Sequence, residues 1–226
     1  MSNDVTGADF SFDKIGEFDE HINLSIPNYQ HIWDTVKRMS SYFIQDKTCV
    51  YDLGCSTGIG LNLIRNSNKG EENVSYIGYD ISKNMLEKVE NRDIVKFNGD
   101  ITNPAILFPN ASIVMSIFTL QFLTPSQRES VLKRVHSGLN KGGAFILCEK
   151  VYLNDGKFQD IFTFTYYDFK MQSFTSDDIL GKQYALRKIM KPLSMTENEE
   201  MLRSAGFEKV QTFFQSLNFV GWVCIK

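Results

Sequence analysis

The 226-residue sequence lacks several features that mark whole classes of protein. It has no uninterrupted run of about 18 apolar residues, so we expect no membrane-spanning helix. Its first nine residues are polar and acidic, unlike a secretion signal, which favours a cytoplasmic protein. With a formal net charge of −3 the chain lacks the basic excess of nucleic-acid-binding proteins, so direct nucleic-acid binding is not expected.

Cysteine and histidine are also scarce. No C-x-x-C pair occurs, and reduced thiols are expected at Cys49, Cys55, Cys148 and Cys224. The three histidines share no spacing typical of metal ligands, so we expect no metal site. Residues 54–60 read Gly-x-x-x-Gly-x-Gly, which is neither the G-x-G-x-x-G of dinucleotide enzymes nor a P-loop.

The most informative stretch is residues 50–60. An apolar run ends in Asp52, a glycine-rich turn follows, and an amphipathic segment begins near Leu61. This is the order strand, tight turn, helix. Gly54 and Gly58 allow positive φ and close approach of a ligand to the backbone, next to a helix N-terminus that favours negative charge.

Alternating strands and helices surround this turn. The pattern predicts strands at 49–53, 74–80, 94–97, 112–117 and 144–149, and helices at 29–43, up to 65, near 83–89 and at 126–139. Residues 140–143 are expected to form a helix C-cap turn.

The alternation then changes. Two helices are predicted within 156–190, a helix with a capping box at 196–199 follows, and strands 207–214 and 219–225 can pair antiparallel. We therefore predict one domain over 1–226, an α/β doubly wound Rossmann-like sheet that is mostly parallel with an antiparallel C-terminal hairpin. An N-terminal helical cap (1–45) and a helical insertion (151–195) complete it.

Acidic residues end the first three predicted strands. Asp52, Asp80 and Asp100 occupy these ends, and an acid after the second strand can accept hydrogen bonds from ribose hydroxyls.

Together with Gly54 and Gly58, this order resembles the class I S-adenosylmethionine (SAM) methyltransferases. Within them the chain is most similar to the carboxy-SAM synthases, which use prephenate to convert SAM into carboxy-SAM for tRNA wobble-uridine modification. The resemblance covers about residues 12–225. The segments that carry it are 25–29, 51–56, 99–101, 118–123, 168–170 and 205–207.

The resemblance implies SAM as the cofactor, a small-molecule substrate and a homodimer. It also implies a set of SAM-pocket residues. These are Tyr29, Asp52, Gly54, Cys55, Ser56, Gly58, Asp80, Ile81, Asp100, Ile101 and Ile117.

Two positions depart from the family pattern. Ile117 stands where the family has a pocket Asn, and Gln183 stands where it has the Arg that pairs with the carboxylate of carboxy-SAM. A charged donor binds a carboxylate more strongly than a neutral one. Arg187, four residues further along the same predicted helix, is a candidate substitute.

Four functions stay open. Methyl transfer to a small molecule is the first, because SAM carries its own leaving group and needs only binding and orientation. Carboxy-SAM synthesis is the second. The third is cyclisation of SAM to azetidine-2-carboxylate and methylthioadenosine, for which the rings of Tyr166 and Tyr167 are candidates because aromatic faces attract a sulfonium. The fourth is a non-catalytic SAM-binding subunit.

Overall fold

The computed structural model of the protein describes residues 18–68, 70 and 73–226, so residues 1–17 of the predicted N-terminal cap (1–45) lie outside the described residues. Within the described residues, a single sheet has the strand order β3-β2-β1-β4-β5-β7-β6. Its strands are β1 (Cys49–Leu53), β2 (Ser75–Asp80), β3 (Ile94–Asn98), β4 (Ala111–Ile117), β5 (Leu139–Lys150), β6 (Lys209–Ser216) and β7 (Phe219–Ile225).

The first five strands are parallel, and β7 runs antiparallel to both β5 and β6. The chain reverses its winding between β1 and β4, which is the place where doubly wound sheets bind ligands. The predicted doubly wound sheet with an antiparallel C-terminal hairpin is confirmed.

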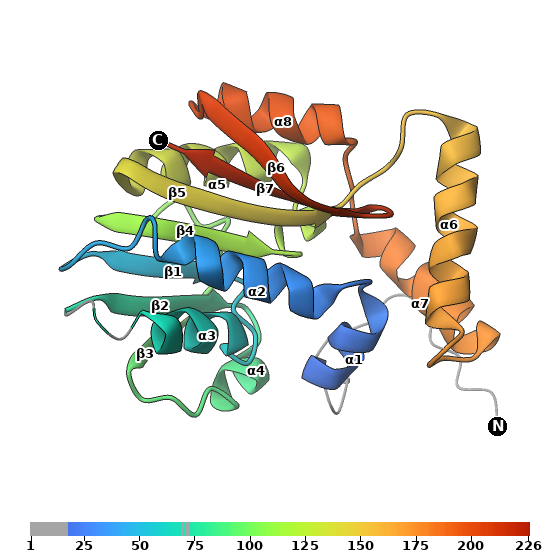
Figure 1. Ribbon diagram of the computed structural model, residues 1–226, viewed down its shortest axis with the longest axis horizontal. Helices are drawn as coiled ribbons and strands as arrows, with labels where there is room; N and C mark the ends of the chain where they lie inside the picture. The colour runs from blue at the N-terminus through green and yellow to red at the C-terminus, as the bar shows by residue number, and fades with distance from the viewer. Residues whose placement is uncertain (1–17, 69, 71–72) are drawn as a thin grey trace.

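Helices cover both faces of this sheet (Figure 1). One face carries α2 (Tyr29–Ser40), α3 (Ile59–Ser67) and α4 (Lys83–Glu87), and the other carries α5 (Pro125–Gly138) and α8 (Met195–Ser204). The period of two along a strand divides the core accordingly. Val50 packs in the cluster that contains Trp33, whereas Tyr51 packs in the cluster that contains Phe108.

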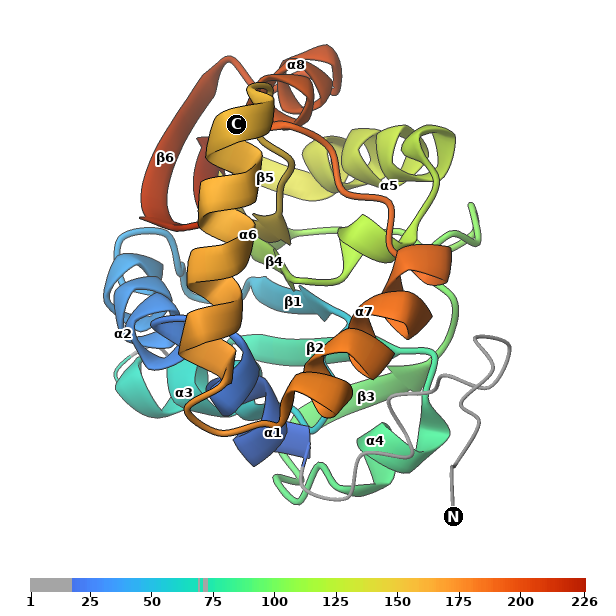
Figure 2. The same cartoon turned by 90° about the vertical axis from the view of Figure 1, so that its right-hand side faces the viewer.

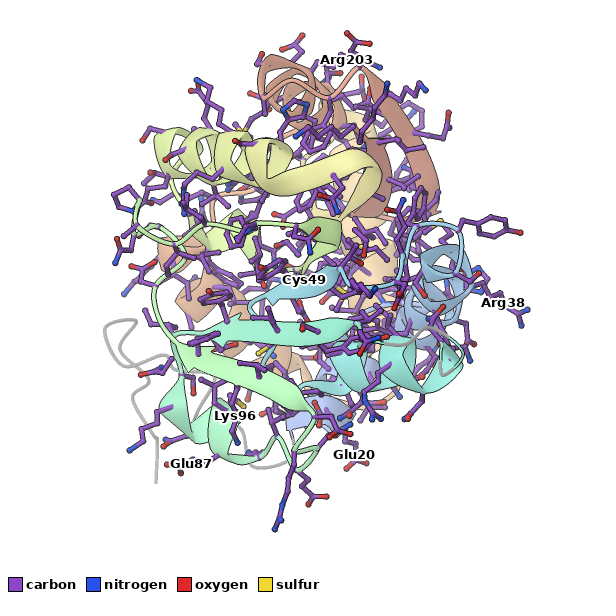
Figure 3. The ribbon with its side chains drawn as sticks, turned by 90° about the vertical axis from the view of Figure 1, so that its left-hand side faces the viewer. Glu20, Arg38, Cys49, Glu87, Lys96 and Arg203 are labelled. Atoms are coloured by element: carbon purple, nitrogen blue, oxygen red, sulfur yellow. The ribbon has the colours of Figure 1, made fainter. Side chains whose placement is uncertain are left out.

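Three helices lie beyond the carboxyl ends of the parallel strands. Figure 2 looks onto this end and shows α1 (Phe18–Ser25), α6 (Gly156–Lys170) and α7 (Ser176–Ile189) in front of the strands. Figure 3 shows the opposite end, where Cys49 begins β1. The described cap and the insertion therefore meet over the strand ends, where the three acids were predicted.

Two local predictions were wrong. Residues 140–143 belong to β5, because α5 ends at Gly138 and the chain enters the strand at once. A Cβ at Gly138 would lie 2.2 Å from the Phe108 carbonyl oxygen, so the helix end packs too closely there for a side chain. The capping box of α8 uses Ser194 and Glu197 rather than 196–199, so this helix begins two residues earlier than predicted.

No helix among the described residues is long and apolar enough to cross a membrane.

Candidate functional site

A cavity of about 770 Å³ lies at the carboxyl ends of the parallel strands. Small-molecule sites range from about 300 to 1,000 Å³, so its size suits a nucleoside with a second small reactant. Its walls come from the ends of β1, β2, β4 and β5, from the glycine loop, and from α1, α6 and α7. The N-terminal cap and the helical insertion thus contribute to one chamber.

The glycine loop is held tightly against its neighbours. Gly54 has φ +84°, and a Cβ there would lie 2.2 Å from Thr119 Oγ1. The amides of Gly54 and Cys55 both donate to the Tyr79 carbonyl, at 2.8 and 3.0 Å. Only glycine fits position 54 without displacing Thr119.

Gly58 has the predicted positive φ at a helix N-terminus, but it lies outside the cavity lining. It caps α3 with φ +77°, and a Cβ there would lie 3.1 Å from Val89, outside the cavity lining. This glycine sets the entry of α3 rather than a wall of the site.

Asp80 organises the loop and the next helix. One of its carboxylate oxygens accepts from the Ser56 amide and the other from the Ser82 amide, each at 2.8 Å. Ser82 is also the N-cap of α4. Asp80 also lines the cavity, and an acid at this strand end can accept hydrogen bonds from ribose hydroxyls.

Asp52 is a buried acid, 3 % exposed, at the end of β1. Desolvation, and secondly the charge of Asp80, raise its pKa to about 8. Such a carboxyl gains from a cation that enters the cavity. The α-ammonium of SAM is a cation of this kind. The Ser56 hydroxyl, which has no hydrogen-bond partner among the described residues, lies in the same loop. The loop thus fits the amino-acid part of SAM.

The third strand end and its neighbours complete the predicted pocket. Asp100 Oδ1 accepts from the Thr102 amide at 2.8 Å, which fixes the carboxylate beside the cavity. The remaining lining positions from the prediction are Tyr29, Ile81, Ile101 and Ile117. All the predicted SAM-pocket residues except Gly58 therefore line one cavity.

Two lining residues have left-handed backbone although they are not glycines. Ser56 has φ 49° and Phe118 has φ 60°. The Phe118 amide donates to the Cys148 carbonyl at 2.7 Å, and its ring contacts Phe219 with centroids 5.8 Å apart. These contacts hold Phe118 in a conformation that bulky residues rarely adopt.

Of the three proposed catalytic residues only Tyr166 lines the cavity, and the Tyr167 ring lies beside it with centroids 6.2 Å apart. Tyr166 lines the cavity, is 7 % exposed, and donates its hydroxyl to the Ser25 carbonyl at 2.9 Å. Tyr167 packs on Phe164 and lies outside the lining. Arg187 is exposed on α7 and also lies outside the lining, whereas Gln183 is inside it.

The structure adds site residues that sequence reasoning missed. From α1, Asp19 accepts from Thr57 Oγ1 at 2.8 and 3.0 Å, which ties the cap to the glycine loop. Three lysines also line the cavity: Lys150, Lys170 and Lys182. Lys170 lies in segment 168–170, which carries part of the family resemblance, and Lys182 directly precedes Gln183. However, a lysine in a predicted helix is usually expected to face the solvent.

Comparisons with known proteins identify the family of the chain. A family model described as a methyltransferase domain matches residues 50–143. The carboxy-S-adenosyl-L-methionine synthase of Staphylococcus epidermidis is 38% identical over 216 residues, covering 93% of this chain and 92% of that protein. The synthase of Shewanella halifaxensis is 35% identical, covering 97% of this chain and 93% of that protein.

Solved structures show the same fold at lower identity. A chain in the complex between the Haloferax volcanii Trm112 methyltransferase activator and a putative methyltransferase aligns with a TM-score of 0.61 at 17% identity, covering 97% of this chain and 95% of that one. Human N-acetylserotonin methyltransferase in complex with SAM aligns with a TM-score of 0.57 at 16% identity, covering 87% and 53%. The chain is therefore a SAM-dependent enzyme of the class I methyltransferase fold, and it belongs to the family of the carboxy-SAM synthases.

Proposed function

We propose that this enzyme forms carboxy-SAM from SAM and a carboxyl donor of the prephenate type. The observation that carries the proposal is the extent of the cavity. It begins at the strand-end carboxylates Asp52, Asp80 and Asp100 and continues to α6 and α7. One chamber can therefore hold SAM and a second reactant together, and proximity of this kind supplies much of the rate of a group transfer.

The similarity to named carboxy-SAM synthases over nearly the whole chain supports this reaction over methylation of an unrelated acceptor. The two departures bear on how the product is bound. Ile117 and Gln183 both line the cavity. Both side chains are uncharged, so neither position supplies a charge for a carboxylate. A carboxylate at this site must find its cation on another element.

Cyclisation of SAM is a second candidate because of one specific observation. The buried ring of Tyr166 lines the cavity, and an aromatic face attracts a sulfonium. The neutral Gln183 in place of the family arginine also suits a reaction that makes no carboxylated sulfonium.

Incubation with SAM, with and without prephenate, separates these reactions by mass spectrometry of the products. Carboxy-SAM that forms only with prephenate supports the proposal. Methylthioadenosine formed from SAM alone supports cyclisation. SAM binding without either product contradicts both and leaves methyl transfer or a binding subunit. Asp80→Ala serves as the control with a damaged SAM site.

We also propose the homodimer that the family resemblance implies. The outer face of α6 exposes Phe158, Ile161 and Phe164, the last of which is 65 % exposed. Exposed apolar side chains at helical spacing suit contact with a second copy. Light scattering should give twice the chain mass of 25.9 kDa, and Phe164→Glu should shift the species toward the monomer.

A further inference from the structure

Three lysines from three separate elements line the side of the cavity made by the end of β5, α6 and α7. Lys150 is the last residue of β5, Lys170 is the last residue of α6, and Lys182 lies in α7. All three line the cavity. These three elements follow one another along the chain, and the fold turns the end of β5, the end of α6 and the middle of α7 toward the same cavity.

The cluster has no counter-charge within the described residues. None of the three ammonium groups has a carboxylate within 4.0 Å there, although Lys170 is only 3 % exposed. The acid that acts on Lys170 is Asp178, which is exposed and already accepts from Thr175 in the cap of α7. Buried charges are ordinarily paired, so an unpaired cluster facing a cavity needs a reason.

Aromatic rings give these cations partial compensation. Lys150 Nζ lies 4.9 Å from the centroid of the Tyr166 ring and 5.8 Å from that of Phe219. Lys170 Nζ lies 5.8 Å from the Tyr166 centroid and 5.1 Å from that of Phe174. The Tyr166 face is therefore engaged by two ammonium groups, and ring quadrupoles attract cations without neutralising them.

His21 orients the third lysine. Its Nε2 accepts from Lys182 Nζ, and its ring packs edge-on against Phe174 with centroids 5.1 Å apart. Desolvation, followed by the charges of Lys182 and Lys170, lowers the pKa of His21 to about 4. A neutral imidazole can accept this bond, so His21 holds Lys182 from α1 without removing its charge.

The two ends of the cavity thus carry opposite charge. Carboxylates lie at the glycine-loop end, and ammonium groups lie at the end made by α6 and α7. A sulfonium would be repelled by three ammonium groups in a low-dielectric chamber unless an anion lay between them. SAM alone leaves this end of the cavity uncompensated.

We propose that Lys150, Lys170 and Lys182 form an anion subsite that binds the carboxylates of the second substrate, with His21 as a positioning residue for Lys182. A dicarboxylate suits the cluster, because one carboxylate would leave two of the three ammonium groups unneutralised. The subsite supplies from β5, α6 and α7 the charge that Gln183 lacks. This inference rests on the proposed function only for the identity of the natural ligand.

The pKa values of these lysines give the subsite a measurable signature. Desolvation, and then the charge of Lys170, lower the pKa of Lys150 and of Lys182 to about 8. A bound anion favours the protonated form of a lysine, so binding at pH 8 should take up protons. Affinity should fall as the pH rises above about 8, because the lysines then lose their charge before the ligand arrives.

The test is calorimetry on the full-length protein saturated with S-adenosylhomocysteine, which occupies the nucleoside end without reacting. The probes are prephenate and malonate, with malonamide as the uncharged control. The variants are Lys150→Met, Lys170→Met and Lys182→Met, with Lys188→Met as the matched control, because Lys188 is exposed on α7 and lies outside the cavity.

We expect each cavity variant to weaken binding of both dicarboxylates at least tenfold and to leave the S-adenosylhomocysteine affinity within twofold. Lys182→Arg should keep most of the affinity. His21→Phe removes an acceptor that favours protonated Lys182, so it should weaken malonate binding and increase the proton uptake at pH 8. His21→Asn keeps an acceptor and should lie nearer the wild type in both.

Replacing a buried unpaired lysine by methionine keeps the apolar stem, so these variants should fold with an unchanged or higher melting temperature. Dicarboxylate binding that is equal in the wild type and all three cavity variants would overturn the subsite, as would no binding of either probe by the wild type. Malonate binding that depends on the lysines, without carboxy-SAM formation from prephenate, would support the subsite and contradict the proposed reaction.

Discussion

Asp80→Ala should weaken both the fold and SAM binding. In the folded protein this carboxylate accepts from the amides of Ser56 and Ser82 at 2.8 Å each. Hydrogen bonds to charged groups contribute about 1.5–3 kcal/mol when buried, but Asp80 is half-buried, so we take about 1 kcal/mol for each bond. Asp80→Ala should therefore lower the free energy of unfolding by about 2 kcal/mol and the melting temperature by about 4–8 °C.

The effect on the ligand adds to this loss. A carboxylate that accepts from ribose hydroxyls contributes a further 1–3 kcal/mol, or roughly 5- to 150-fold in the dissociation constant. Chemical denaturation measures the first quantity and calorimetry with SAM measures the second. Asp80→Asn keeps one carbonyl acceptor and should fall between the wild type and the alanine variant in both assays.

The matched control is Asp93→Ala. Asp93 is an acid directly before β3, but it is exposed, and within the described part of the chain its carboxylate pairs with Arg65. Its loss should change stability by less than about 1 kcal/mol and leave SAM affinity unaltered. If Asp80→Ala behaved like Asp93→Ala in both assays, the assignment of Asp80 to the loop and to the ribose would be refuted.

Three further predictions follow from the walls of the site. Gly54→Ala should lower the free energy of unfolding by about 2–5 kcal/mol, because backbone strain and the clash with Thr119 add together. Gly142→Ala shares the positive φ but has open space, so it should lower that free energy by only about 1–2 kcal/mol. Equal losses in chemical denaturation would contradict the clash. Tyr166→Phe should lower the free energy of unfolding by about 1–3 kcal/mol, because the buried Ser25 carbonyl loses its hydrogen-bond donor. An unchanged midpoint of chemical unfolding would exclude that bond. Binding of SAM at pH 7 should release protons, since Asp52 with a pKa of about 8 ionises beside the incoming cation; calorimetry in two buffers should show this release in the wild type and not in Asp52→Asn.

Much of the lining of the strand-end cavity could be predicted because its residues are set by local pattern. Asp52 and Asp80 each end an apolar strand, and parallel strands bring their carboxyl ends to one edge of the sheet. The glycine loop follows β1 directly. These inferences needed only the period of two along a strand and the turn chemistry of glycine, and the observed cavity lies where they converge.

The far end of the cavity could not be predicted in the same way, because long-range packing determines it. Positions 183 and 187 are a helical turn apart but about 40° offset, and this offset leaves Gln183 in the cavity and Arg187 in solvent. Lys150 and Lys170 meet only because β5 and α6 end beside the same aromatic ring. No spacing in the sequence indicates that contact.

The left-handed backbone at Ser56 and Phe118 has a thermodynamic consequence for the whole enzyme. Each such residue costs about 1–2 kcal/mol, so the pair removes a sizeable fraction of the 5–15 kcal/mol by which a typical domain is stable. A Ser56→Gly substitution would raise the free energy of unfolding by part of that amount. It would also allow the glycine loop to adopt other backbone conformations. The native chain is accordingly less stable than its fold allows. Substitutions meant to raise its melting temperature should be placed away from Ser56 and Phe118.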